Sequence, residues 1–306
     1  MSKKKEISII YLTFNGLSNH LEESLDGVLN QRTQHTYEVI VIDSGSTDGT
    51  IKFIEKQPLL KLYKIPNSDF NHGKTRQKGV ELSQGEYIVF LTQDAIPANN
   101  QWLNNLITGF KDPGVVGVCS KILPREDAYI LKKIETNNDL SGRSKKIIAE
   151  VKDQKYFEKL SFCNKRSGYY FFHDISSCIR RDFLMQNNFP DVEFAEDVEF
   201  AKMALKKGKK IVFDPNSVVY HSHDYTIKKT YQRNYIDSKY HKDFFKIKNV
   251  PTLRRAVLNT GGLFLRDLKQ IFKYKVSILE KTGAIFYSPV IHFAEQLGQY
   301  RGTQSR

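Results

Sequence analysis

Three basic side chains stand close together in the string D-F-N-H-G-K-T-R-Q-K-G, where an apolar segment gives way to a helical pattern. They are His72, Lys74 and Arg76. Positive charge in the first turn of a helix opposes the helix dipole, so helix stability does not explain these residues. The pattern predicts a site for an anionic group. A solvated basic turn is the alternative.

Carboxylates stand at the ends of two other apolar segments. Asp43 ends Y-E-V-I-V-I-D, and Asp94 follows V-F-L-T-Q. Asp48 comes at the start of the next helical pattern, so an ordinary Asp turn is the alternative for the first segment. Asp94 lies just after a predicted strand, where α/β folds bind ligands, so it is a candidate ligand-binding residue. For Asp94 the alternative is a strand-end residue without a ligand.

A further acidic pair and two histidines occur late in the chain. Glu196 and Asp197 open an amphipathic helical pattern, where acids are also common because they suit the helix dipole. His221 and His223 follow the strand-like V-V-Y. Side chains two apart lie on the same face only if the strand continues, and then both histidines could bind one metal ion. A surface role is the alternative for either histidine.

Repeated strand and helix patterns must position these residues. Four apolar, β-branched segments at 6–13, 37–43, 59–65 and 86–92 are each followed by a helical pattern. The first helix is expected to be capped by Ser18, and the others to begin near Thr47, Lys74 and Asn99. Four such units predict an α/β fold with a mainly parallel, doubly wound sheet, whose ligands bind beyond the carboxyl ends of the strands.

The later chain is expected to contain an insertion and a helical extension. Residues 115–121 read as a strand, and 124–165 as a charged insertion without a clear strand. Further strands are expected at 174–181, 209–214 and 217–221, with a helix over 196–207. From Thr226 the pattern is basic, aromatic and mostly helical. We therefore expect a catalytic domain over 1–225, with halves at about 1–121 and 122–225, and a basic helical region over 226–306.

Composition and missing motifs exclude several classes of protein. There is no G-x-G-x-x-G and no G-x-x-x-x-G-K-[ST], so dinucleotide-binding and P-loop proteins lose their main support. The three cysteines have no metal-binding spacing, which favours a reducing compartment. No signal-peptide pattern and no run of eighteen apolar residues occurs. We expect a cytoplasmic protein.

The positive charge is concentrated near the C-terminus. Residues 228–281 hold fourteen Lys or Arg against four acids, which accounts for about ten of the thirteen surplus charges. A nucleic-acid surface is not supported, because neither a helix-turn-helix spacing nor an RNP motif is present. Basic amphipathic helices also bind anionic membranes, which predicts a peripheral protein at the inner face of the cell membrane. A solvated appendage or a homodimer contact is the alternative.

The segments Y-L-T-F-N-G and V-I-D-S-G-S-T-D-G-T together resemble the opening of family 2 glycosyltransferases of the GT-A fold. The resemblance implies that Thr13 and Asp43 hold the nucleotide of a sugar donor. F-N-H-G-K-T-R is similar to the bacterial rhamnosyltransferase branch, which implies dTDP-rhamnose as the donor, with a UDP-linked hexose as the runner-up. The expected nucleotide-sugar site comprises Thr13, Asn15, Asp43, Ser46, His72, Lys74, Arg76, Gln93 and Asp94.

The same resemblance implies a metal ion and a catalytic base. The family's D-x-D motif binds Mg²⁺ or Mn²⁺, but here its first Asp is replaced by Thr92, which leaves Asp94 and, later, His221 as ligands. The E-D pair matches the family's catalytic motif, so Asp197 would deprotonate the acceptor hydroxyl while Glu196 orients it.

The expected reaction is a single displacement with inversion onto a lipid-linked or polysaccharide acceptor. A catalytically inactive glycan- or membrane-binding protein is the rival hypothesis, because one metal-binding Asp is missing.

Overall fold

The computed structural model describes residues 5–138, 142–192, 195–223 and 225–305. The chain forms two compact units. The first comprises residues 1–123 and 140–221, and the second comprises residues 124–139 and 222–306. Residues 124–139 therefore group with the C-terminal helices, whereas the sequence placed them with the catalytic domain.

The first unit is built on one mixed sheet in the order β3-β2-β1-β4-β8-β6-β9-β5, with β7 paired to β9. Strands β1 to β4 are mutually parallel neighbours, as the sequence predicted. Beyond them, β8 runs antiparallel to both β4 and β6, so the remaining half of the sheet is mixed. The strands are β1 Ile7–Thr13, β2 Tyr37–Asp43, β3 Leu60–Lys64, β4 Tyr87–Thr92, β5 Ile96–Pro97, β6 Val115–Leu123, β7 Ile147–Ala149, β8 Ser176–Arg180 and β9 Lys210–Tyr220.

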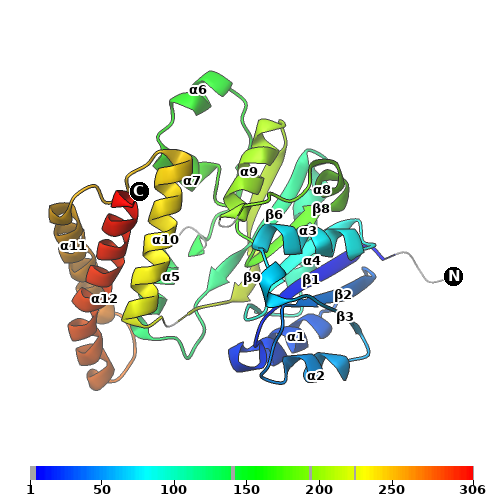
Figure 1. Ribbon diagram of the computed structural model, residues 1–306, viewed down its shortest axis with the longest axis horizontal. Coiled ribbons are helices and arrows are strands. Elements are labelled where there is room, and N and C mark those ends of the chain that lie inside the picture. The colour runs from blue at the N-terminus through cyan, green and yellow to red at the C-terminus, as the bar shows by residue number, and fades with distance from the viewer. Residues whose placement is uncertain (1–4, 139–141, 193–194, 224, 306) are drawn as a thin grey trace. The chain divides into compact units, whose positions relative to one another are not determined.

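Helices follow the parallel strands because apolar residues recur along one face of each helix. Figure 1 shows α1, α3 and α4 beside the strands of the first unit, whereas α6 lies away from them. The helices of this unit are α1 Leu21–Leu29, α2 Thr50–Glu55, α3 His72–Leu82, α4 Trp102–Thr108, α6 Gln154–Lys159, α7 Phe162–Gly168, α8 Arg181–Asn187 and α9 Glu196–Lys206. The core between helices and sheet includes Ile9, Val41, Val89 and Trp102, which are at most 1% exposed.

Several predicted boundaries differ from the structure. Ser18 does not cap α1: it lies in a short 3-10 helix, Leu17–Asn19, and the residue before α1 is His20, which makes no side-chain cap. The region 124–165, expected to lack a strand, contains β7 along the edge of β9. The two strands expected at 209–214 and 217–221 are one strand, β9, whose pairing with β6 shifts register after Ser120.

The second unit is helical, as predicted from Thr226 onward. It consists of α5 Ile130–Asn138, α10 Ile227–Phe245, α11 Leu253–Ile271 and α12 Ile278–Gln304. The C-terminal helices α10, α11 and α12 are the yellow to red helices of Figure 1, and α12 packs along both others. A Cβ atom added to Gly302 would lie 2.3 Å from the backbone oxygen of Tyr235, so a glycine is required where α10 and α12 approach most closely. None of the helices in the described part of the chain has the length and apolar character needed to cross a bilayer.

Candidate active site

The turns after β1 and β2 are tied together by one buried carboxylate. Asp43 is fully buried and accepts a hydrogen bond from the Thr13 hydroxyl at 2.8 Å. It also accepts hydrogen bonds from the backbone N–H of Ser46 at 2.8 Å and from the Ser46 hydroxyl at 2.6 Å. Thr13 and Asp43 are register partners on neighbouring parallel strands, so the sheet itself brings them together.

Two further predicted residues join the same edge of the sheet. The Asn15 N–H donates to the Ser46 hydroxyl at 2.8 Å, and the Asn15 side-chain oxygen accepts from the Thr47 N–H at 2.8 Å. Gln93 follows β4 and holds the backbone of Phe14 through a donated and an accepted hydrogen bond. The loops after β1, β2 and β4 therefore form one connected polar surface at the carboxyl ends of the strands, where α/β folds bind ligands.

The pairing of β5 with β9 brings Asp94 next to His221. The short strand β5 pairs antiparallel with the end of β9, with Ile96 opposite Tyr220. As a result, Nε2 of His221 lies 3.4 Å from Oδ1 of Asp94, and both side chains are largely buried. Adjacent ligands of an octahedral ion at about 2.1 Å are about 3 Å apart, so this pair fits one divalent cation. The imidazole nitrogen suits Mn²⁺ better than Mg²⁺.

Helix α3 begins with the basic string that the sequence singled out. The Asn71 side chain caps it by accepting a hydrogen bond from the Lys74 N–H at 3.0 Å. Lys74 is exposed, with its ammonium 3.5 Å from Asp191. A Cβ atom added to Gly73 would lie only 2.0 Å from the carbonyl oxygen of Pro190, so this glycine lets α3 press against the loop that precedes α9. The H-G-K-T-R string thus positions α3 against the acidic pair.

Arg76 is buried and ion-paired rather than exposed. Its Nη1 lies 2.6 Å from Oε1 of Glu196, and its Nε lies 3.6 Å from Oδ2 of Asp174. The guanidinium also lies against the ring faces of Phe90 and Phe189, at 5.8 and 5.9 Å from the ring centroids. A buried guanidinium needs such partners because burial without compensation is costly. Arg76 therefore fixes the carboxylate of Glu196.

Asp197 follows at the first turn of α9. The helix begins after Ala195, whose φ of 57° is a left-handed conformation that costs a non-glycine residue about 1 to 2 kcal/mol. Burial raises the pKa of Asp197 to about 6, the neighbouring Glu196 charge adds to this shift, and Arg166 and Arg76 oppose it. A carboxylate with this pKa is ionised at neutral pH and is more basic than an ordinary Asp, which suits a general base.

Sequence reasoning missed Asp174. This residue precedes β8, is 3% exposed, and accepts a hydrogen bond from the Ser177 hydroxyl at 2.7 Å. Burial raises its pKa to about 7, with Arg76 acting in the opposite direction. The only signal in the sequence was that Asp174 lies within the largely apolar segment F-F-H-D-I-S-S-C-I. A carboxylate is seldom buried in such a segment unless it has a partner or a function.

The predicted residues of the first unit thus form three groups. Thr13, Asn15, Asp43, Ser46 and Gln93 are hydrogen-bonded around the strand ends, Asp94 pairs with His221, and Arg76 contacts Glu196. His72 lies beside Arg76, with its Nδ1 3.4 Å from Nη1. His223, the other histidine considered for the metal, belongs to the second unit. The roles of these residues in binding and catalysis stay predictions.

An α/β sheet with polar side chains at its strand ends and an acid pair nearby is the arrangement of an enzyme that binds its ligand at this edge of the sheet. The family model described as "Glycosyl transferase family 2" matches residues 8–186. The chain belongs to this family and is a glycosyltransferase.

Relatives and solved structures agree with that membership. The chain is 30% identical over 286 residues to the O-antigen chain rhamnosyltransferase RfbN of Salmonella typhimurium, covering 85% of this chain and 88% of the relative. It is 29% identical to the O-antigen chain rhamnosyltransferase WbaN of Salmonella anatum, covering 84% and 87%. Among solved structures, the mannosyltransferase PcManGT of Pyrobaculum calidifontis, in complex with GDP-Man and Mn²⁺, superposes with a TM-score of 0.59 at 17% identity and covers 99% of this chain and 87% of that one. The predicted GT-A fold is thereby confirmed.

Proposed function

We propose that this enzyme transfers L-rhamnose from dTDP-rhamnose, with inversion, to a lipid-linked or polysaccharide acceptor in the synthesis of a cell-surface glycan. The observation that carries the proposal is the half-buried Asp197, with a pKa near 6, beside a Glu196 that Arg76 holds in place. Support for rhamnose comes from the F-N-H-G-K-T-R string and from the two relatives that are O-antigen rhamnosyltransferases.

Asp197 would act as the general base. Its carboxylate accepts the proton of the acceptor hydroxyl while the hydroxyl oxygen attacks the anomeric carbon and the bond to the nucleoside diphosphate breaks. Inversion follows because a single displacement needs no covalent intermediate. Glu196 cannot share this role equally, since its Oε1 is engaged by Arg76 at 2.6 Å. It is placed instead to orient the acceptor or the base.

The nucleotide-sugar would bind along the strand ends and the start of α3. Thr13, Asn15, Asp43, Ser46 and Gln93 already form a fixed polar surface there, so little reorganisation is needed. Of the basic residues, Lys74 is exposed and suits the diphosphate, whereas Arg76 is buried against Glu196. A divalent ion held by Asp94 and His221 would supply positive charge to the departing diphosphate.

A donor screen tests the proposal. Purified enzyme is incubated with dTDP-rhamnose or a set of UDP-hexoses, each with Mg²⁺, Mn²⁺ or EDTA, and nucleoside diphosphate release is measured. We expect release from dTDP-rhamnose, fastest with a divalent ion. Release from UDP-hexoses alone would make the UDP-hexose alternative correct. Nucleotide binding without any turnover would favour an inactive binding protein.

We further propose that the second unit binds the anionic inner face of the cell membrane. The exposed face of α11 carries Val257, Leu258 and Leu265, each more than half exposed, at the spacing of one helical stripe. On α12, Leu279 and Phe286 are 83% and 74% exposed. Large apolar side chains this exposed on neighbouring packed helices indicate a surface that contacts a partner.

The positive charge of these helices favours an anionic membrane as the partner. Residues 253–281 contain seven Lys or Arg against two acids. Each basic side chain near an anionic bilayer contributes about 1 kcal/mol of attraction, while the apolar side chains enter the interface. A membrane contact suits an enzyme whose acceptor is attached to a lipid. Association of two copies through the same face is the alternative that the vesicle experiment below distinguishes.

A further inference from the structure

A cavity of about 830 Å³ lies within the second unit. Its walls come from α5, α10 and α12 together with Tyr129, His223, Tyr225 and Thr226, so it is formed within one compact unit. The volume is in the upper part of the range of about 300 to 1,000 Å³ that small-molecule sites occupy. None of the residues assigned above to donor binding or catalysis lines this cavity.

Tyrosine rings form much of the wall. Tyr129 and Tyr287 meet edge to face, with ring centroids 6.1 Å apart. Tyr225 stacks on His223 at 5.0 Å, with an angle of 13° between the ring planes. An aromatic ring with a polar tip offers an apolar face and a hydrogen-bonding group at once. This suits the alternating C–H faces and hydroxyl edges of a sugar ring.

The charges in the wall balance one another. The cavity is lined by Lys132, Arg233 and two histidines, His223 and His292, and by three acids, Glu135, Asp237 and Glu295. Lys132 lies 3.0 Å from Glu135, and His292 lies 3.0 Å from Glu295. A site for a diphosphate or a lipid headgroup would need a surplus of positive charge. The balanced wall therefore favours a neutral ligand with many hydroxyl groups.

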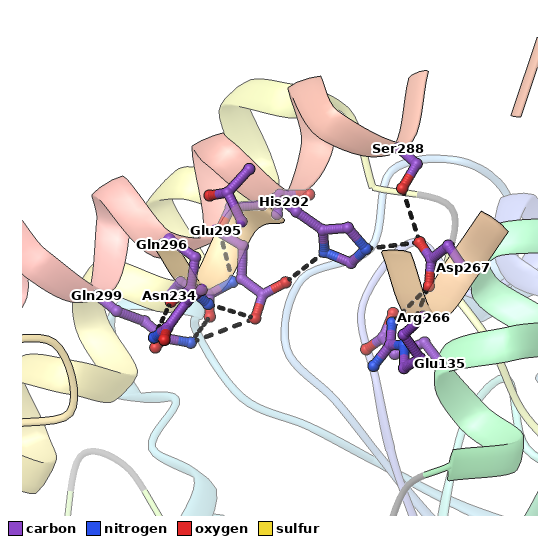
Figure 2. Close-up of polar contacts among 12 residues, drawn as sticks. Glu135, Asn234, Arg266, Asp267, Ser288, His292, Glu295, Gln296 and Gln299 are labelled. Carbon is purple, nitrogen blue, oxygen red and sulfur yellow. Dashed lines mark hydrogen bonds and ion pairs between the residues drawn. The ribbon is translucent and has the colours of Figure 1, made fainter. Parts of the chain in front are cut away.

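A partly buried hydrogen-bond network holds the lining residues His292, Glu295 and Asn234 in place (Figure 2). Nε2 of His292 lies 2.7 Å from the buried carboxylate of Asp267, which also accepts a hydrogen bond from Ser288 at 2.8 Å. The Gln299 amide donates to Asn234 at 2.9 Å. Polar side chains fixed in this way on packed helices are already ordered before a ligand arrives, which lowers the entropic cost of binding.

We propose that this cavity binds a neutral saccharide unit of the acceptor glycan. The proposal rests on the proposed glycosyl transfer, because it assigns the second unit to the acceptor while the first unit binds the donor. In the chain, the cavity residues His223 and Tyr225 follow closely after the candidate metal ligand His221.

Saturation-transfer NMR on the full chain tests this site. The probes are the methyl glycosides of L-rhamnose, D-mannose, D-galactose, D-glucose and N-acetyl-D-glucosamine, with inorganic pyrophosphate as a competitor. We expect signal for at least one glycoside that pyrophosphate does not displace. The signal should fall at least fivefold in Tyr225→Ala and in Asp237→Asn, and should persist in Tyr225→Phe, which keeps the ring.

Phe244→Ala is the matched control, because Phe244 is an exposed aromatic residue of the same unit that does not line the cavity. Absence of signal for every glycoside, or an equal signal in Tyr225→Ala and wild type, overturns the proposal. Calorimetric titration with dTDP is run on the wild type and on each variant. Unchanged dTDP binding in Tyr225→Ala shows that the donor site is intact, whereas failure of the wild type to bind dTDP contradicts the proposed function and not this site.

Discussion

Asp197 shares its surroundings with two other carboxylates and one buried guanidinium. Arg76 contacts both Glu196 and Asp174, so its single charge is divided between two acids. Burial raises the pKa of Asp197 to about 6 and that of Asp174 to about 7, and the negative charge of the neighbouring carboxylates adds to both shifts. Removal of Arg76 would raise both further.

The pH dependence of transfer should report the ionisation of Asp197. The base must be deprotonated to accept a proton, so kcat/KM should rise about tenfold per pH unit up to about pH 6 and then level off. The measurement is transfer rate at subsaturating substrate between pH 4.5 and 8. A profile that stays flat between pH 5 and 7 would contradict this assignment.

Removal of either candidate metal ligand should weaken the response to the divalent ion. Asp94→Asn and His221→Ala each take away one ligand of a pair 3.4 Å apart. The Mn²⁺ concentration for half-maximal donor turnover should increase on the order of tenfold or more. His20→Ala, which changes an imidazole elsewhere in the first unit, is the control. The same Mn²⁺ dependence in the wild type, in both ligand variants and in the control would exclude a metal ion at this pair.

At the residue scale, the sequence indicated individual side chains better than their partners. Asp94 and His221 were expected as ligands from different parts of the chain, and the pairing of β5 with β9 explains their contact. Arg76 was expected at an anionic ligand, but its contact with Glu196 depends on how α3 meets α9, which no local pattern encodes. Asp174 was missed for the same reason.

At the scale of elements, helix α11 has one buried face and one exposed face, and both carry apolar residues. One face packs against its own unit, where Ala256 and Ile271 are fully buried. The opposite face exposes Val257, Leu258 and Leu265. A helix that served only as a solvated appendage would carry polar residues there, because exposed apolar side chains gain nothing from water.

Replacement of Leu258 by Asp should impair membrane binding. The charge adds repulsion from anionic lipid and a cost for entering the interface, so the affinity for vesicles of phosphatidylglycerol and phosphatidylethanolamine should fall at least tenfold. Co-sedimentation measures it, with Leu59→Asp, an exposed apolar site of the first unit, as the control. If the wild-type protein does not bind anionic vesicles, and instead forms dimers that the substitution Leu258→Asp dissociates, the membrane proposal is wrong and the apolar face of α11 joins two copies.

At this scale, the elements that the sequence predicted correctly are those in which apolar residues recur with a regular period. The parallel strands and the long C-terminal helices were expected, because each repeats its pattern over several turns or residues. Short or interrupted elements were not predicted. β7 has only three residues, and β9, which was expected as two separate strands, changes its register with β6 near the expected break. The start of α1 was misplaced because Ser18 looked like a cap, whereas a 3-10 turn precedes the helix.

At the scale of the whole molecule, the two units differ in what stabilises them. The first has a large apolar core between sheet and helices, whereas the second also buries a charged network around Asp267 and His292. The composition of the sequence predicted a basic C-terminal region, but it did not show that residues 124–139 belong to the same unit. That assignment depends on α5 packing against α11 and α12, a contact between distant parts of the chain.

The second unit should lose stability as pH rises through about 9. Hydrogen bonds and charge from Asp267 and Glu295 raise the pKa of His292 from 6.5 to about 9, although burial acts in the opposite direction. The folded state therefore binds this proton more tightly than the unfolded state. The contribution is fully present below about pH 6.5 and is lost as the pH rises through 9, with a size on the order of 3 kcal/mol.

Urea unfolding of wild type and His292→Gln at pH 6 and pH 10 measures this contribution. The difference in free energy of unfolding between the two proteins should be larger at pH 6 and should shrink at pH 10. His35→Gln, in an exposed pair with Glu6, controls for general histidine effects. A difference that is constant with pH would show that the His292 proton does not stabilise the fold.

The most direct test of the central claim is the substitution Asp197→Asn, which removes the base and keeps the shape of the side chain. Transfer of labelled rhamnose from dTDP-rhamnose into the lipid-linked glycan of a membrane fraction is compared with dTDP binding. Glu199→Gln is the control, because Glu199 lies on the same helix and pairs with Lys202. We expect transfer to fall at least a thousandfold, with dTDP binding unchanged and the control fully active. Transfer retained by Asp197→Asn would contradict the assignment of this residue as the base.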